Sequence, residues 1–325
     1  RGRRGCTRMI RRLLVGTAIL LLIFSGLAIY GLHAPRPSLD DLDLKLGQIE
    51  VDGRQRTFRY VASPQSVGPM TVLLALHPSM SSGERMREFV GPLFEPMIQQ
   101  QPMLVVYPDG FEGHFNDCRK AARYSARQLQ IDDVGFLQAI VEQLATRYPL
   151  DRGQIHALGY SNGAHMAYRL AQEAPNFLRG LIAVAANLPT EANNACSRTR
   201  GQLTRAVLIQ GTEDPINPYT GGEVTLWGFG QRGQVHSAGD SAVRLAHWLG
   251  IQGTATTPEN HPGTRVQTWQ QGGAGSAGRG RAAGHVDRRD CRRVPRGQRA
   301  DGAGAWCRDA VARRGRIARG GGAAL

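Results

Sequence analysis

Short uninterrupted runs of apolar residues recur along the middle of the chain, separated by segments in which apolar residues return every three or four positions. The uninterrupted runs are typical of strands buried on both faces of a parallel sheet, and the spaced pattern is typical of helices that cover it. Their alternation predicts an α/β fold with a mostly parallel, doubly wound sheet. The predicted strands are residues 71–76, 103–107, 155–158, 181–186 and 206–209, and the predicted helices are residues 86–99, 133–148, 164–174 and 241–249.

A different pattern precedes the first of these strands. Residues 46–51 and 56–61 flank the dipeptide Asp52-Gly53, which is a strong signal for a tight hairpin. We therefore predict two antiparallel strands at one edge of the sheet. Asp132 and Asp133 stand at the start of the second predicted helix, and we expect them to cap it rather than to act in catalysis.

The amino-terminal region contains an almost wholly apolar stretch, residues 13–32, directly after Arg11 and Arg12. A helix of this length matches a bilayer core of about 30 Å and exceeds the roughly 7 to 15 apolar residues of a cleaved signal peptide. We expect residues 1–36 to be a basic terminus with an uncleaved membrane anchor, and a cleaved signal peptide is the alternative. The preceding arginines place the following chain outside the cytoplasm. The predicted location is secreted or periplasmic, with tethering to the inner membrane.

The carboxyl-terminal region, residues 270–325, has an unusual composition. Thirteen Gly, thirteen Arg and twelve Ala occur there, without Lys, Phe or Tyr, and no strand is predicted beyond Trp269. Residue types encoded by G- and C-rich codons dominate, as in a high-GC gene read out of frame. A frameshift near residues 270–275 is one hypothesis, and a natural disordered basic tail is the other. The predicted catalytic domain is therefore residues 44–269, with an incomplete or disordered end.

The positive charge is confined to the two ends of the chain. The net charge is +14, with six Arg among the first twelve residues and thirteen Arg against four acids in residues 270–325. The middle of the chain is close to neutral, so the predicted domain has no basic face for nucleic acid, and no nucleic-acid partner is expected.

The pentapeptide Gly159-Tyr160-Ser161-Asn162-Gly163 lies between a predicted strand and a predicted helix. In a strand-turn-helix of this kind, flanking glycines allow a sharp turn that exposes the serine hydroxyl as a nucleophile. Ser161 is the candidate nucleophile, and an ordinary turn serine is the alternative.

A tetrahedral intermediate also needs backbone N–H donors, which we assign to Asn162 and to Ser79 or Met80 in the small-residue loop after the first predicted strand. His77 at the start of that loop is expected to brace it.

A serine nucleophile needs a histidine base, and that histidine needs an acid to orient it. Asp214 follows the predicted strand 206–209, at the carboxyl edge where open α/β sheets assemble their sites. Glu213 is the rival acid, and a turn-capping role before Pro215 is the other interpretation of Asp214.

Several motifs in this order resemble those of the polyhydroxybutyrate depolymerase and feruloyl esterase family. They cover His77 and its loop and residues 105–111, 115–117, 131–137, 159–163 and 211–219. The resemblance spans about residues 45–269. It implies an α/β-hydrolase fold, hydrolysis of carboxylic esters through an acyl-enzyme without a cofactor, export from the cell, and Ser161 and Asp214 as nucleophile and acid. Where members of this family commonly have Gly after the strand-end histidine, this chain has Pro78.

The resemblance also implies a catalytic histidine in a Gly-Gly-His setting, after a final apolar strand just beyond Trp269. That setting is missing, and His285 is the candidate base because it lies at about the expected distance. The expected function is a serine esterase acting on polyhydroxyalkanoate, feruloyl or acetyl esters. The alternative is a catalytically impaired relative that lacks the native histidine and only binds esters.

Substrate contacts are predicted from aromatic residues in loops. Trp227 and Phe229 stand among glycines in a long segment that we expect to form a rim over the site, with Phe111 and His114 on the other side. Ordinary packing is the alternative for each.

Cys118 and Cys196 lie inside the predicted domain, where an exported protein permits a disulfide, and two separate thiols are the other possibility. No Cys or His spacing indicates a metal site.

Overall fold

The structure, a computed structural model, describes residues 42–64, 68–197, 201–226, 228, 230–252, 255, 259–261, 263–270 and 282–288, with only the backbone described at 259–261 and 282–288. All of these residues lie in one compact unit, Leu39–Arg293. None of the described helices is long and apolar enough to cross a bilayer. The predicted membrane segment, residues 13–32, lies outside the described residues, so the anchor stays a prediction.

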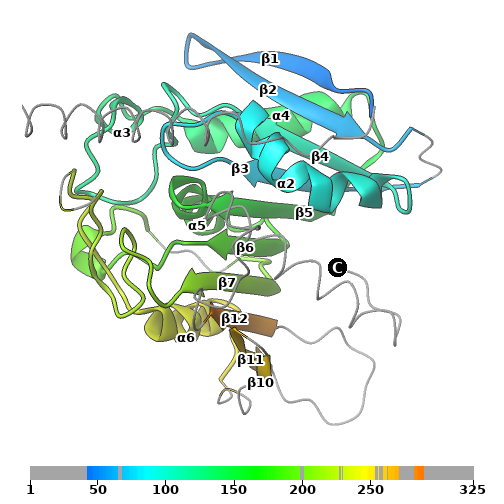
Figure 1. Ribbon diagram of the computed structural model, residues 1–325. Coiled ribbons are helices and arrows are strands. Elements are labelled where there is room, and N and C mark those ends of the chain that lie inside the picture. The colour runs from blue at the N-terminus through cyan, green and yellow to red at the C-terminus, as the bar shows by residue number, and fades with distance from the viewer. Residues whose placement is uncertain are drawn as a thin grey trace, which may run out of the picture. The chain divides into compact units, whose positions relative to one another are not determined.

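Ten strands of the described chain form one sheet in the order β1-β2-β4-β3-β5-β6-β7-β12-β11-β10, from the top to the bottom of Figure 1. The six central strands are parallel, and two strands at each edge run antiparallel. The strands are β1 Lys45–Val51, β2 Arg54–Ala62, β3 Met70–Leu76, β4 Met103–Pro108, β5 Leu150–Tyr160, β6 Gly180–Val184, β7 Arg205–Gly211, β10 Glu259–His261, β11 Thr264–Gln270 and β12 Ala282–Arg288. The predicted α/β-hydrolase fold, a mostly parallel sheet with an antiparallel N-terminal hairpin, is confirmed.

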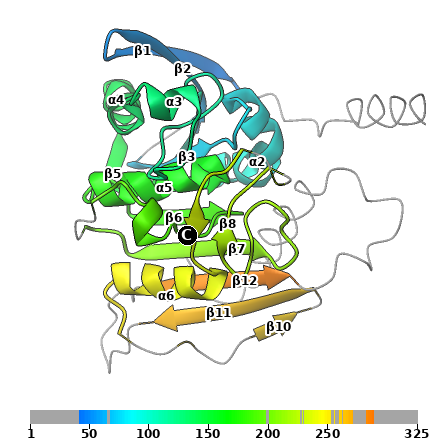
Figure 2. The same ribbon diagram turned by 90° about the vertical axis from the view of Figure 1, so that its left-hand side faces the viewer.

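Helices fill the connections, as the spaced apolar pattern predicted. They are α2 Gly83–Ile98, α3 Ser125–Gln128, α4 Asp133–Ala145, α5 Asn162–Glu173 and α6 Ala238–Trp248, with a 3-10 turn at Glu191–Asn193. Helix α5 packs on β3, β5 and β6 and contacts α4 and α6, so these three helices cover the same face of the sheet (Figure 2). Two short strands, β8 Gly222–Glu223 and β9 Gln234–Val235, form a separate ribbon that the sequence did not predict.

The first hairpin has the predicted turn. Asp52 and Gly53 adopt φ of 55° and 68°, the left-handed values that a two-residue type I′ turn needs, and Val51 pairs with Arg54 across it.

The two acids at the start of α4 have different roles. Asp132 caps the helix, since its carboxylate accepts a hydrogen bond of 2.8 Å from the Gly135 N–H. Asp133 is fully buried and forms an ion pair of 2.6 Å with Arg56 of β2. The prediction that Asp133 is a cap is therefore wrong, because its carboxylate turns inward to a cation that is distant in sequence.

Strand β12 corrects the prediction that no strand follows Trp269. Its backbone pairs in parallel with β7 and antiparallel with β11. A strand inserted between two others forms backbone hydrogen bonds on both sides, and Ala and Gly backbones supply these despite their low β-propensity. Residues 271–281 and 289–325 lie outside the described residues, and the disorder or frameshift proposed for them stays a prediction.

Candidate functional site

The turn between β5 and α5 holds Ser161 in a strained conformation. Its φ of 52° and ψ of −113° lie outside the regions that side-chain-bearing residues favour. The backbone hydrogen bond of 2.8 Å from Ser161 N–H to the Val184 carbonyl secures the turn. A Cβ at Gly159 would overlap the Gly163 carbonyl, and one at Gly163 would overlap the Leu76 carbonyl. Both glycines are therefore needed to bring strand and helix this close, as the sequence pattern predicted.

The loop after β3 begins beside the N-terminus of α5, where the helix leaves backbone N–H groups without intrahelical acceptors. His77 is buried and braces this loop: its Nε2 accepts from the Gly110 N–H at 2.8 Å, so Nδ1 carries the proton and donates to the Pro78 carbonyl at 2.7 Å. Burial lowers the pKa of His77, which keeps this neutral form. The contacts support bracing rather than proton transfer to substrate.

Ser79 and Met80, the predicted oxyanion donors, form the tip of the same loop. Met80 has a φ of 56° and a side chain that is 69% exposed. The turn at Gly113 lies against Met80 and Ser81, so the segment carrying Phe111 and His114 borders this loop. Whether either N–H donates to an intermediate stays a prediction, as does the same role for the Asn162 N–H.

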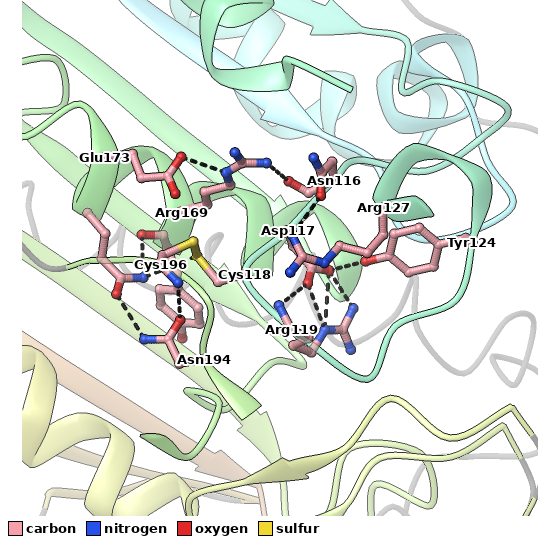
Figure 3. The surroundings of a disulfide bond; sticks show 12 residues. Asn116, Asp117, Cys118, Arg119, Tyr124, Arg127, Arg169, Glu173, Asn194 and Cys196 are labelled. Atoms are coloured by element: carbon pink, nitrogen blue, oxygen red, sulfur yellow. Dashed lines mark hydrogen bonds and ion pairs between the residues drawn. A yellow bond between two sulfur atoms is a disulfide. The ribbon is translucent and has the colours of Figure 1, made fainter. Parts of the chain in front are cut away.

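The Asn162 side chain ties the nucleophile turn to a buried polar network. Its Oδ1 accepts from the Phe115 N–H at 2.8 Å, and its Nδ2 donates to the Asp117 carboxylate at 2.7 Å. Asp117 also accepts from Tyr124 Oη and from the Arg119 guanidinium, which approaches to 2.6 Å (Figure 3). Burial alone would raise the pKa of Asp117, but Arg119 holds it well below its usual range. The residue after the nucleophile is thus fixed by an ionised carboxylate.

We expect Asp117→Ala to lower the free energy of unfolding by about 3–5 kcal/mol, because it leaves the buried Arg119 without a counter-ion. Chemical denaturation of the full chain measures this loss. Glu142→Ala is the matched control: Glu142 pairs with Arg152 on an exposed surface, where the expected loss is about 0–1 kcal/mol. Similar losses in the two variants would contradict the assignment of Asp117 as a buried structural anion.

A disulfide joins Cys118 to Cys196 next to this network (Figure 3), with a Cα–Cα distance of 5.3 Å. The sequence allowed either a disulfide or two separate thiols, and the structure contains the disulfide. It ties the loop that carries Asp117 to the segment after β6. Beside it, the Ala195 N–H donates to the Cys118 carbonyl at 2.8 Å.

Replacing both Cys118 and Cys196 by serine is expected to lower the free energy of unfolding by about 2–4 kcal/mol, because the bridge closes a long loop in the unfolded chain. Denaturation with and without dithiothreitol measures the effect. Reductant should destabilise the unmodified protein to a similar extent and leave the double variant unchanged. Insensitivity of the unmodified protein to reductant would count against the bridge.

Asp214 lies at the carboxyl edge of the sheet, in the loop after β7. Its Oδ1 accepts hydrogen bonds of 2.9 Å from the N–H groups of Ile216 and Asn217, and Gln210 donates to Oδ2 at 3.2 Å. Strands β5 and β7 are two strand spacings apart, or about 10 Å. Asp214 is thus fixed at the same carboxyl edge of the sheet as Ser161. The side chain of Glu213, the rival acid, is exposed. An aspartate that only caps the turn would make these same hydrogen bonds. The catalytic role of Asp214 therefore stays a prediction.

The structure describes only the backbone of His285, so its role as the base stays a prediction. His285 lies inside β12, paired with Leu208 of β7, and this row continues through Ala183 to Gly159. Its backbone is therefore three strand spacings, about 14 Å, from β5. Among the described side chains, no histidine is hydrogen-bonded to the Ser161 hydroxyl.

The structure describes two of the four predicted substrate-contact residues, Phe111 and His114. Phe111 packs against a small cluster that includes Tyr124, and Arg54 lies 5.5 Å from its ring centroid. The His114 ring stacks on Tyr124 at 4.7 Å, with 12° between the planes. These contacts are also those of ordinary packing. Trp227 and Phe229 lie outside the described residues, so their predicted role is untested.

No protein-family model matches the chain. The putative esterase NocK of Nocardia uniformis subsp. tsuyamanensis is 28% identical over 180 residues, which cover 54% of this chain and about half, 49%, of NocK. This similarity agrees with the resemblance to esterases of the α/β-hydrolase superfamily.

Among solved structures, a thermostable esterase is 14% identical with a TM-score of 0.43, over 54% of this chain and 48% of that one. The CE1 ferulic acid esterase AmCE1/Fae1A from Anaeromyces mucronatus is 15% identical with a TM-score of 0.43, over 57% and 80% of the two chains. At these values, neither similarity bears on substrate or mechanism.

Proposed function

We propose that the protein is a serine esterase that hydrolyses carboxylic esters through an acyl-enzyme. The observation that carries this proposal is Ser161, held at φ 52° at the carboxyl end of β5 by two glycines that tolerate no side chain. Such a turn presents a hydroxyl next to the N–H groups that begin a helix, where negative charge is stabilised. Similarity to a putative esterase over half the chain supports the proposal.

The proposed reaction has two steps. Ser161 Oγ attacks the ester carbonyl while a histidine takes its proton; the carbonyl oxygen becomes an anion beside the N–H groups of Asn162 and of Ser79 or Met80. The alcohol leaves with the proton, and water then attacks the acyl-enzyme by the same route. Asp214 orients the histidine and stabilises its charged form. His285 is the sequence candidate for this histidine.

A second candidate function rests on the sequence around His285, which lacks the apolar run and the Gly-Gly-His setting that the family resemblance implies. A chain without the native base would bind esters at the Ser161 turn without hydrolysing them. The finer assignments also belong to the proposal: polyhydroxyalkanoate, feruloyl or acetyl esters as substrates, and export with anchoring by residues 13–32.

Two measurements on the full chain separate the candidates. An active esterase hydrolyses p-nitrophenyl acetate, and a fluorophosphonate probe attaches to the peptide that contains Ser161, as mass spectrometry can determine. A chain that binds without catalysis releases no p-nitrophenol above the buffer rate and takes up no probe, yet aryl esters raise its unfolding temperature. Hydrolysis with the probe attached to another residue would reject the proposed nucleophile.

A further inference from the structure

Arg232 occupies the segment between β8 and β9, on the predicted rim of the site. Its backbone is fixed, because its N–H donates to the Val224 carbonyl at 2.8 Å and its carbonyl accepts from Asn193 Nδ2 at 3.0 Å. Its guanidinium carbon lies 5.1 Å from the centroid of the Tyr124 ring. The side chain is half-buried, so a charged group is held close to the domain rather than extended into water.

Tyr124 connects this guanidinium to the nucleophile turn. The Tyr124 hydroxyl lies 3.1 Å from Asn162 Nδ2, and Asn162 directly follows Ser161. The His114 ring, which stacks on the Tyr124 ring, belongs to the turn that borders the Met80 loop. Arg232 is therefore separated from the proposed catalytic turn by a single aromatic side chain.

The charges around Tyr124 do not balance within the described part of the chain. Two guanidinium groups, those of Arg119 and Arg232, lie near one carboxylate, that of Asp117. The Asp117 oxygens already accept from Arg119, Tyr124 and Asn162. Burial and the neighbouring Arg119 lower the pKa of Arg232, as expected for a cation that lacks an anion of its own. No hydrogen bond or ion pair from its guanidinium to another described residue is found.

We propose that Arg232 binds a carboxylate carried by the ester substrate. The proposal rests on the esterase function and narrows its substrate class to esters that also carry an anionic group. A guanidinium binds a carboxylate through two parallel hydrogen bonds, and partial burial strengthens such a pair. The substrate anion would supply the charge that this cluster lacks.

The test compares three esters on the full chain: p-nitrophenyl pentanoate, which is neutral; mono-p-nitrophenyl glutarate, with a carboxylate on the acyl side; and 4-carboxyphenyl butyrate, with a carboxylate on the leaving group. Each anionic ester is also measured against its methyl ester. We expect kcat/KM to be higher for at least one of the two anionic esters than for the methyl ester of the same compound. Arg232→Gln should lower the ratio of kcat/KM for that anionic ester to kcat/KM for its methyl ester by roughly 10- to 100-fold. Arg232→Lys should restore part of it.

Arg244→Gln is the matched control, since it removes one positive charge from an exposed ion pair with Glu191. It should leave the preference intact. Equal kcat/KM for anionic and neutral esters, or a preference that survives Arg232→Gln, would overturn the proposal.

A binding measurement keeps this test separate from the esterase proposal. In the Ser161→Ala background, monomethyl glutarate should raise the unfolding temperature more than dimethyl glutarate does, and Arg232→Gln should abolish the difference. This result, without hydrolysis by the unmodified chain, would reject the esterase function while supporting an anion site. Hydrolysis of neutral esters without the binding difference would reject the role of Arg232 alone.

Discussion

Ser161→Ala is expected to reduce ester hydrolysis by roughly 10³- to 10⁶-fold, to the level that binding and oxyanion stabilisation alone can sustain. The fold should persist, because the described contacts of Ser161 are made by its backbone, which alanine retains. The measurement is kcat/KM for p-nitrophenyl acetate, with circular dichroism to check folding. Ser197→Ala, at an exposed position, serves as the control and should retain full activity. Hydrolysis that survives Ser161→Ala would reject this residue as the nucleophile.

Asp214→Asn is expected to lower kcat by about 10⁴-fold, because an amide cannot stabilise the charged histidine or fix its tautomer as a carboxylate does. The amide oxygen can still accept from the Ile216 and Asn217 N–H groups, so the turn should survive. Stability should therefore change far less than activity.

Glu213→Gln provides a control from the adjacent position, since it removes the same charge from an exposed side chain. It should leave kcat nearly unchanged. If Glu213→Gln produced the large loss and Asp214→Asn did not, the acid would be Glu213. A small effect of both variants would reduce Asp214 to a turn cap.

Much of the fold follows from local sequence patterns. The continuous apolar runs that became β3, β4, β6 and β7 were predicted because strands covered on both faces cannot alternate with polar residues. The nucleophile turn was predictable for a similar reason: only glycine fits where Gly159 and Gly163 meet neighbouring backbone. In contrast, β12 has no apolar run, and its place depends on pairing with β7 and β11, which no local pattern reveals.

The polar network behind the turn was not predicted. Asn162 lies 45 positions from Asp117 and 38 from Tyr124, and Arg56 lies 77 from Asp133, so each pair is created by the fold. The motif at residues 115–117 was part of the family resemblance, but the sequence did not indicate that Asp117 would be buried. A carboxylate between Asn116 and Cys118, with an arginine two positions later, was the available signal.

The position of the disulfide along the chain has a consequence for biosynthesis. If the chain is exported as proposed, amino end first, Cys118 emerges before Cys196, and Cys291 and Cys307 emerge after both. Cys196 would then be the first thiol that Cys118 meets outside the cytoplasm. Simple oxidation in order of emergence would yield the correct pairing, with no need for an isomerase to correct mispaired intermediates.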